Sequence, residues 1–170
     1  SGYQLLLEEQ RQHRIPSNTQ IEYDCESRSL IFDTYNIETQ IDKALKKRVW
    51  LPCGGYLVID HCEAMTVIDV NSGKMILGRD LEETALRVNL EAAQEIARQL
   101  RLRNLSGIII VDFINMENEI YQKELIQAVK KWLRNDPVPC HFVDITALGL
   151  AEITRKKAQK PVFEAFFCAD

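Results

Sequence analysis

The sequence lacks the two spacings that commonly bring zinc ligands together. It has no cysteine pair in the C-x-x-C spacing and no histidine pair in the H-x-x-x-H spacing. Its five cysteines are odd in number and scattered, and its three histidines lie far apart along the chain. These features argue against a zinc hydrolase and against a disulfide framework. We expect reduced thiols, as in proteins of a reducing compartment.

Long apolar runs are also missing. No stretch approaches the roughly 18 unbroken apolar residues that a membrane span needs, and the first residues do not form a basic segment followed by an apolar one. With 170 residues, of which 46% are hydrophobic and 27% charged, the chain is suited to one globular domain with a core. The sequence predicts a soluble, cytoplasmic protein with no membrane-spanning segment.

Positive charge is in the minority, and the formal net charge is −4. A nucleic-acid partner stays compatible with the sequence, because phosphate contacts depend on local clusters of Lys and Arg. Basic residues gather in three runs, at 43–48, 98–103 and 155–160. Each run fits an ordinary solvated helix face equally well, and that alternative stays open.

Hydrophobic periodicity predicts a mixed β-sheet covered by helices, an α/β (α+β) fold. Asp80 is expected to cap a long helix, and the β-branched run at 108–111 is typical of a strand covered on both faces. Residues before about 36 are expected to be irregular apart from a short strand at 20–23. The other expected strands are 49–51, 56–60, 65–70, 108–111 and 141–145, and the expected helices are 36–47, 81–103, 118–134 and 149–160.

Two acidic residues stand at the ends of predicted strands. Asp69 follows the apolar segment 66–68, and Asp112 follows 108–111. Two carboxylates at the rim of one sheet repel each other unless a cation lies between them, and oxygen ligands without His or Cys favour Mg²⁺ or Mn²⁺. Asn71 lies on the same strand face as Asp69 and could add an amide ligand. The alternative is that each acid caps the turn that follows it.

Six phrases then carry a likeness that spacing alone does not supply. Between residues 37 and 157, glycine-rich turns, two acids and a long helix follow one another in the order found in the catalytic segment of the ribonuclease E/G family. The chain therefore resembles that family over about 120 residues. The phrases are LPCGGYLVID at 51–60, EAMTVIDVNSG at 63–73, LEET at 81–84, NLEAA at 89–93, IARQLRLRNL at 96–105 and VDFI at 111–114.

The resemblance implies an activity and roles for particular residues. In the family, the acids at the positions of Asp69 and Asp112 coordinate the catalytic magnesium, and the asparagine at the position of Asn71 assists. The implied fold is similar to the deoxyribonuclease I class, and the implied reaction is endonucleolytic cleavage of single-stranded RNA in processing and decay, leaving a 5′-phosphate and a 3′-hydroxyl. The expected RNA-backbone contacts, each equally compatible with a structural salt bridge, are Arg98, Arg101, Arg103, Arg155, Lys156 and Lys157.

Some positions depart from the family pattern. Asn115 stands where the family commonly has an aspartate, and Cys53 stands where serine is usual. The family's C-P-x-C zinc phrase has no counterpart, so zinc is not expected in this chain. Nothing in the sequence resembles the family's S1 domain or its sensor for the RNA 5′ end.

The departures leave other functions open. The main alternative is a catalytically weak module that binds RNA or mediates oligomerisation. The assemblies expected from it are homo-oligomers. A third is an unrelated phosphodiesterase acting on DNA or a small phosphoester. We expect three segments: 1–35 as the end of a preceding subdomain, 36–160 as the catalytic subdomain and 161–170 as a tail.

Overall fold

The chain divides into two units, Ser1–Asp42 and Lys43–Asp170, and the described part of the first contains helices and irregular segments but no strand. The computed structural model describes residues 2–23, 31–73, 81–158 and 161–162. Within the first unit lie α1 (Gly2–Arg11), α2 (Ile31–Thr34) and most of α3 (Ile37–Ala44). The described side chains of α1 and α3 include no buried one, so these helices contribute little core of their own.

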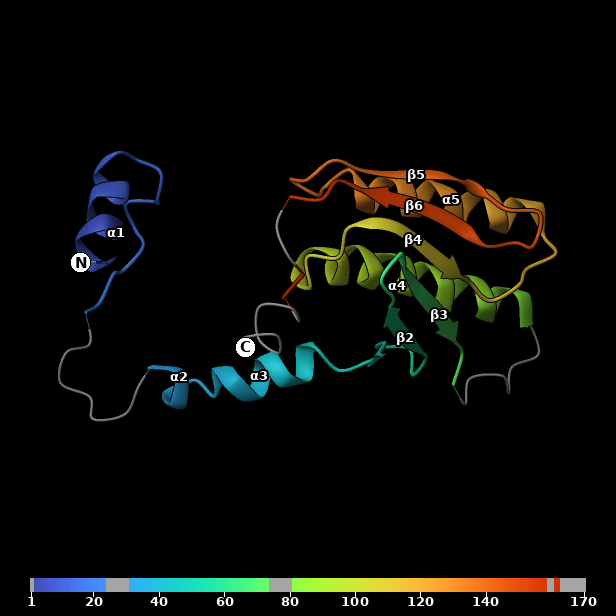
Figure 1. The fold of residues 1–170 in the computed structure, drawn as a ribbon, viewed down its shortest axis with the longest axis horizontal. Coiled ribbons are helices and arrows are strands. Elements are labelled where there is room, and N and C mark those ends of the chain that lie inside the picture. Colours follow the sequence, from blue (N-terminus) through green and yellow to red (C-terminus); the bar gives the residue numbers. More distant parts are fainter. Residues whose placement is uncertain (1, 24–30, 74–80, 159–160, 163–170) are drawn as a thin grey trace. The chain divides into compact units, whose positions relative to one another are not determined.

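The second unit is built on a six-stranded mixed sheet with the strand order β1-β2-β3-β4-β6-β5 (Figure 1). The strands β3 and β4 are parallel, and all other neighbours are antiparallel. The parallel pair requires a crossover, which α4 supplies. The strands are β1 (Arg48–Trp50), β2 (Tyr56–His61), β3 (Met65–Asn71), β4 (Gly107–Asp112), β5 (Cys140–Ile145) and β6 (Ala151–Arg155).

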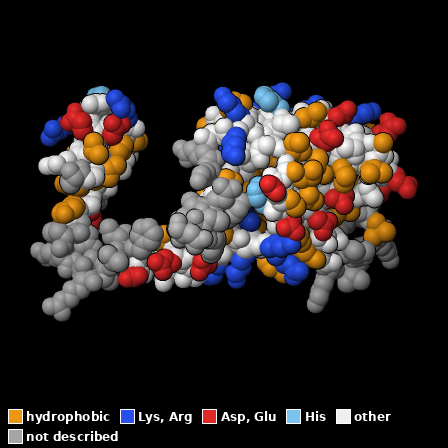
Figure 2. Space-filling model, viewed as in Figure 1, with side chains coloured by type: hydrophobic (Ala, Val, Ile, Leu, Met, Phe, Trp, Pro, Cys, Tyr) orange, Lys and Arg blue, Asp and Glu red, His pale blue; other side chains and the backbone are white. Residues whose placement is uncertain are grey.

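Two long helices, α4 (Leu81–Leu102) and α5 (Glu119–Leu133), lie against one face of this sheet (Figure 1). Strand residues alternate accordingly: Ile68 and Val70 are buried in the core, whereas Val67 and Asp69 are exposed. Within residues 43–158, no described helix covers the opposite face. Figure 2 shows that face with hydrophobic and acidic side chains side by side.

The main elements confirm the predictions from periodicity. Asn118 accepts a hydrogen bond from the amide of Ile120 and caps α5, and that helix ends before Asp136 and Pro137. The mixed sheet and the strands β1 to β5 lie where the sequence predicts them, within a residue or two. The described helices include none that is long and apolar enough to cross a membrane.

Three predictions about elements were wrong. Helix α1 forms in a segment expected to be irregular, and residues 20–23 are not a strand. The predicted helix at 149–160 is instead the strand β6, which follows β5 through a turn in which Gly149 has φ +82°. Ala151 and Ile153 point inward from β6, but so does Arg155, and this inward arginine hides the two-residue apolar period.

The proposed Asp80 cap and most of the predicted tail at 161–170 lie outside the described residues. The segment boundary near residue 36 stays a prediction.

Candidate functional site

The two acids singled out in the sequence lie side by side on the sheet. Asp69 of β3 and Asp112 of β4 are register partners in the parallel ladder. Both are exposed, on the face opposite the helices. Neighbouring strands are about 4.8 Å apart, so the two carboxylates leave adjacent backbone positions on one face. The sheet thus brings the two acids together on one exposed face, which is what a shared cation site requires.

Asn71 joins this pair through Asp69. Its Nδ2 atom donates a hydrogen bond of 2.6 Å to Oδ2 of Asp69, since the two side chains point to the same face of β3. That bond orients the carboxylate and uses the amide nitrogen. The amide oxygen is therefore the atom with which Asn71 would ligate a cation.

Glycines fix the backbone around Asn71. A Cβ on Gly55 would lie 2.8 Å from the carbonyl oxygen of Asn71, and a Cβ on Gly73 would lie 2.5 Å from that of Gly54. Gly73 also has φ +63°, a conformation in which other residues are strained. The turn at 52–55 thus packs directly on the end of β3, which only glycine permits at both positions.

The segment after Asp112 is held by helix α4. The fully buried side chain of Asn89 donates from Nδ2 to the carbonyl of Ile114 (2.8 Å) and accepts through Oδ1 from its amide (3.0 Å). Glu82, in the first turn of α4, accepts from the amides of Glu117 and Asn118. These contacts position the chain as it leaves the sheet beside Asp112.

A hollow of about 230 Å³ lies beyond the ends of β3 and β4, with Ser72, Glu82 and Asn115 in its lining. Asn115 presents an amide there, where the family pattern has a carboxylate. Any auxiliary negative charge at this position is absent from the chain.

The donor set suits a hard cation. Mg²⁺ commonly binds through one or two carboxylates and completes its coordination with water and substrate phosphate. Two carboxylates and an amide oxygen fit that pattern. Among the described residues there is no cluster of three or more His, Cys, Asp and Glu side chains, which are the groups that build closed protein metal sites.

The predicted RNA contacts do not surround these acids. Arg155 is the register partner of Gly107, which lies at the other end of β4 from Asp112. At 3.3 Å per residue, Gly107 and Asp112 are about 16 Å apart along the strand. Arg101, Lys156 and Lys157 are exposed. Arg98 is also largely exposed, and its hydrogen bonds with Glu95 raise the pKa of the guanidinium.

Two of the predicted RNA contacts lie inside the fold. Arg103 is 6% exposed and donates to the side chain of Gln99 and the carbonyl of Lys46. Burial lowers its pKa, although a guanidinium stays charged at neutral pH. Arg155 is 4% exposed and is ion-paired with Asp136. Neither guanidinium is accessible enough to bind an RNA backbone.

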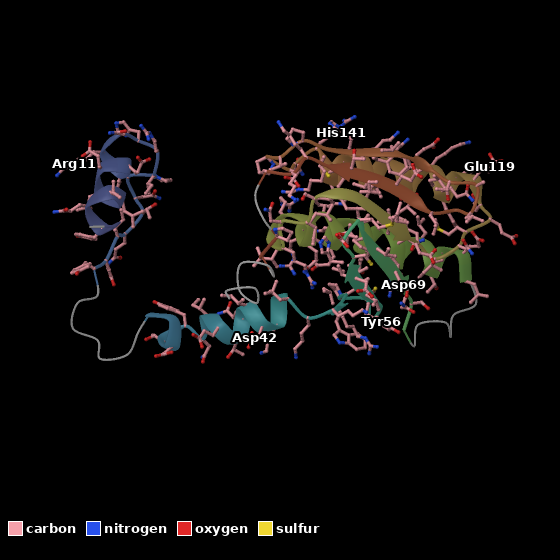
Figure 3. All side chains as sticks on the ribbon, in the orientation of Figure 1. Arg11, Asp42, Tyr56, Asp69, Glu119 and His141 are labelled. Atoms are coloured by element: carbon pink, nitrogen blue, oxygen red, sulfur yellow. The ribbon has the colours of Figure 1, made fainter. Side chains whose placement is uncertain are left out.

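Aromatic residues near the acids were not singled out from the sequence. Tyr56 is the register partner of Asn71, and Trp50 is the register partner of Tyr56. Figure 3 shows Tyr56 and Asp69 near each other at the same end of the sheet. The sequence signal for them was the alternation of Arg48, Val49 and Trp50 next to the basic run at 43–48, which puts Arg48 and Trp50 on one strand face.

A model of the Ribonuclease E/G family matches residues 3–158 of the chain. The chain belongs to this family. Ribonuclease G of Escherichia coli (strain K12) is 42% identical over 160 residues, which make up 94% of this chain and 32% of that protein. Ribonuclease E of Nostoc sp. (strain PCC 7120 / SAG 25.82 / UTEX 2576) is 48% identical over 139 residues, 82% of this chain and 20% of that protein.

A further relative shows a similar level of identity over a similar part of its length. Ribonuclease G of Haemophilus influenzae is 45% identical over 130 residues, 76% of this chain and 26% of that protein. The resemblance drawn from the six phrases is thereby confirmed. The chain of this family member spans about a third or less of the length of the curated relatives it matches.

Proposed function

We propose that this family member carries the divalent-cation site of an endoribonuclease, in which Asp69 and Asp112 hold Mg²⁺, or Mn²⁺ in its place. The observation that supports this most directly is the register pairing of the two acids on one exposed sheet face. The substrate would be single-stranded RNA. The products would carry a 5′-phosphate and a 3′-hydroxyl.

Each residue has a distinct task in this proposal. The carboxylates of Asp69 and Asp112 bind the cation and leave its other positions to water and a substrate phosphate. Asn71 holds the carboxylate of Asp69 in position through the 2.6 Å hydrogen bond. When bound, the cation supplies Lewis-acid polarisation of the scissile phosphate and a water of lowered pKa for in-line attack.

The exposed cations Arg98, Arg101, Lys156 and Lys157 are proposed as contacts to the RNA backbone away from the scissile bond. Of these, Arg101, Lys156 and Lys157 lie toward the far end of the sheet and would act on distant nucleotides. A cytoplasmic location and assembly into homo-oligomers stay predictions. Zinc has no part in the proposal.

A second function is favoured by the burial of two predicted RNA contacts, Arg103 and Arg155, which are 6% and 4% exposed. Fewer cations are then left on the described surface for phosphate contacts than the sequence predicts. In this alternative the chain serves as an RNA-binding or oligomerisation module with little turnover. The two functions differ in whether cation binding leads to cleavage.

The first experiment measures Mn²⁺ binding to the chain by electron paramagnetic resonance, which does not depend on turnover. We expect Asp69→Asn and Asp112→Asn each to abolish or strongly weaken binding. Asp60→Asn is the matched control, because Asp60 is an exposed acid on the same sheet face whose partner is Lys47. Equal Mn²⁺ affinity in wild type and both site variants would overturn the assignment.

The second experiment follows cleavage of a fluorogenic single-stranded RNA with Mg²⁺ and with chelator. Cleavage that chelator stops, and that both site variants lose, supports the enzyme. Cation and RNA binding without product supports the module instead. Cleavage of a matched DNA oligonucleotide in preference to RNA would point to the unrelated phosphodiesterase.

A further inference from the structure

Three side chains form a cluster on β1 and β2 that the proposed cation site does not use: Arg48, Trp50 and Tyr56. The ring centroids of Trp50 and Tyr56 are 5.2 Å apart, with an angle of 59° between the planes. The guanidinium carbon of Arg48 lies 4.6 Å from the centroid of Tyr56 and 6.0 Å from that of Trp50. We call this cluster the Trp50 platform.

The indole of Trp50 is turned to solvent. Trp50 is 63% exposed, although tryptophan is on average a highly buried residue. An exposed aromatic ring next to an arginine is the usual composition of a surface on which bases of single-stranded nucleic acid stack. The exposed indole is the surface that such stacking requires, and it lies on β1, an edge strand of the sheet.

The platform is aligned with the two acids by the sheet register. Arg48 pairs with Val58, Val58 with Asp69, and Asp69 with Asp112, so these residues form one row across four strands. Trp50, Tyr56 and Asn71 form the next row. Two strand spacings, about 10 Å, separate Arg48 from Asp69. At the spacing of about 3.4 Å per nucleotide found along one strand of duplex DNA, about three stacked nucleotides span that distance.

A basic hollow of about 720 Å³ adjoins the platform at the outer edge of β1. Lys43, Lys46, Arg48, Trp50 and Arg98 are among the residues that line it. No described carboxylate lies within ion-pair distance of Lys43, Lys46 or Arg48, whereas Arg98 is paired with Glu95. The hollow therefore carries positive charge that phosphate groups would neutralise.

We propose that the Trp50 platform stacks a base of single-stranded RNA a few nucleotides from the scissile bond, and that the basic hollow contacts the adjoining phosphates. The inference rests on the proposed function, because it takes RNA to be the substrate. The RNA strand would then follow the row of residues that runs from Arg48 across the sheet to Asp69. It adds a base contact that is independent of the cation. The platform can thus be tested without turnover.

The experiment uses the Trp132→Phe variant of the full chain, in which Trp50 is the one remaining tryptophan. A labelled single-stranded RNA is titrated in the presence of chelator, and both RNA anisotropy and tryptophan fluorescence are recorded. We expect quenching of Trp50 that follows the anisotropy curve. In this background, Trp50→Ala should weaken binding about 5-fold to 100-fold, and Trp50→Phe should retain most of the affinity.

Circular dichroism melting separates binding from folding. A Trp50→Ala chain that melts cooperatively and binds weakly supports the platform. RNA binding at wild-type affinity by that variant, or Trp50 fluorescence unchanged at saturating RNA, would overturn the inference and leave the cluster as a stabilising cross-strand contact. Absence of RNA binding by the Trp132→Phe chain would also overturn it. Loss of Mn²⁺ binding or cleavage with quenching intact would count against the proposed function alone.

Discussion

The guanidinium of Arg155 lies 2.9 Å from the carboxylate of Asp136, and the two side chains are only 3% and 2% exposed. Arg155 also donates to the side chain of Asn104 and to the carbonyl of Leu105, each at 3.0 Å. One buried cation thus joins the end of β6 to the turn after α4 and to the segment after α5. This network explains an arginine at an inward position of a strand.

Removal of Arg155 should destabilise the fold. Arg155→Ala leaves the carboxylate of Asp136 buried without its cation, and breaking a buried pair in this way costs about 3–5 kcal/mol. We expect that loss in the free energy of unfolding measured with urea. Lys156→Ala, at the exposed neighbour, should change it by less than about 0.5 kcal/mol. Equal stabilities of the two variants would contradict the structural role.

The same pair should make stability depend on acid pH. Burial by itself raises the pKa of Asp136, but hydrogen bonds from Arg155 and the Val138 amide, with the charges of Arg155 and Arg101, outweigh it and leave that pKa below its ordinary value. The unfolded chain therefore takes up this proton first as the pH falls. The contribution is present above about pH 4, the ordinary range of aspartate, and is lost below it.

Urea midpoints between pH 6 and pH 3 test this, with Asp136→Asn as the comparison. The difference in stability between wild type and Asp136→Asn should be constant in the upper part of that range and shrink below about pH 4. A difference that grows toward low pH would show the opposite shift.

Asn89 should stabilise the segment beside Asp112. Asn89→Ala removes the partner of both backbone polar groups of Ile114, and we expect a loss of about 1–3 kcal/mol in stability. Hydrogen exchange of the Ile114 amide should accelerate, and Mn²⁺ should bind more weakly. Gln94→Ala, an exposed position on the same helix, is the control. Unchanged exchange at Ile114 would contradict this role.

Two glycine substitutions separate steric overlap from backbone strain. Gly73 and Gly107 both have positive φ, but a Cβ on Gly73 would lie 2.5 Å from the carbonyl oxygen of Gly54, whereas a Cβ on Gly107 meets nothing within 4 Å. Gly107→Ala should cost about 1–2 kcal/mol from φ alone. Gly73→Ala should cost more and also weaken Mn²⁺ binding, because Asn71 is two residues away. Equal costs in urea unfolding would contradict the packing argument.

Much of this fold could be predicted because local patterns agree with tertiary contacts. In β3, alternation of Ile68 and Val70 with Val67 and Asp69 identifies the strand and the exposed face of the acid. In α5, Asn118 and Pro137 mark the ends. The partnership of Asp69 with Asp112 could be expected but not located, because register depends on the whole sheet.

The rest depended on contacts that no local pattern reports. Arg155 looks like a surface cation in sequence, and its burial follows only from Asp136, a partner 19 residues earlier in the chain. The alternation in β1 indicates that Arg48 and Trp50 share one strand face, but not that this face also carries Asp69. The relation of Trp50 to Asp69 appears only once β1, β2 and β3 are aligned.

The close packing at Gly55 and Gly73 has one more consequence. Side chains in a strand alternate between faces, so a slip of β3 by a single residue would turn Asp69 into the hydrophobic interior and Ile68 out to water. The turn that these glycines seal onto the end of the strand acts as a stop against such a slip. A substitution that loosens this turn would therefore remove the proposed cation site while leaving the circular dichroism spectrum of the chain nearly unchanged.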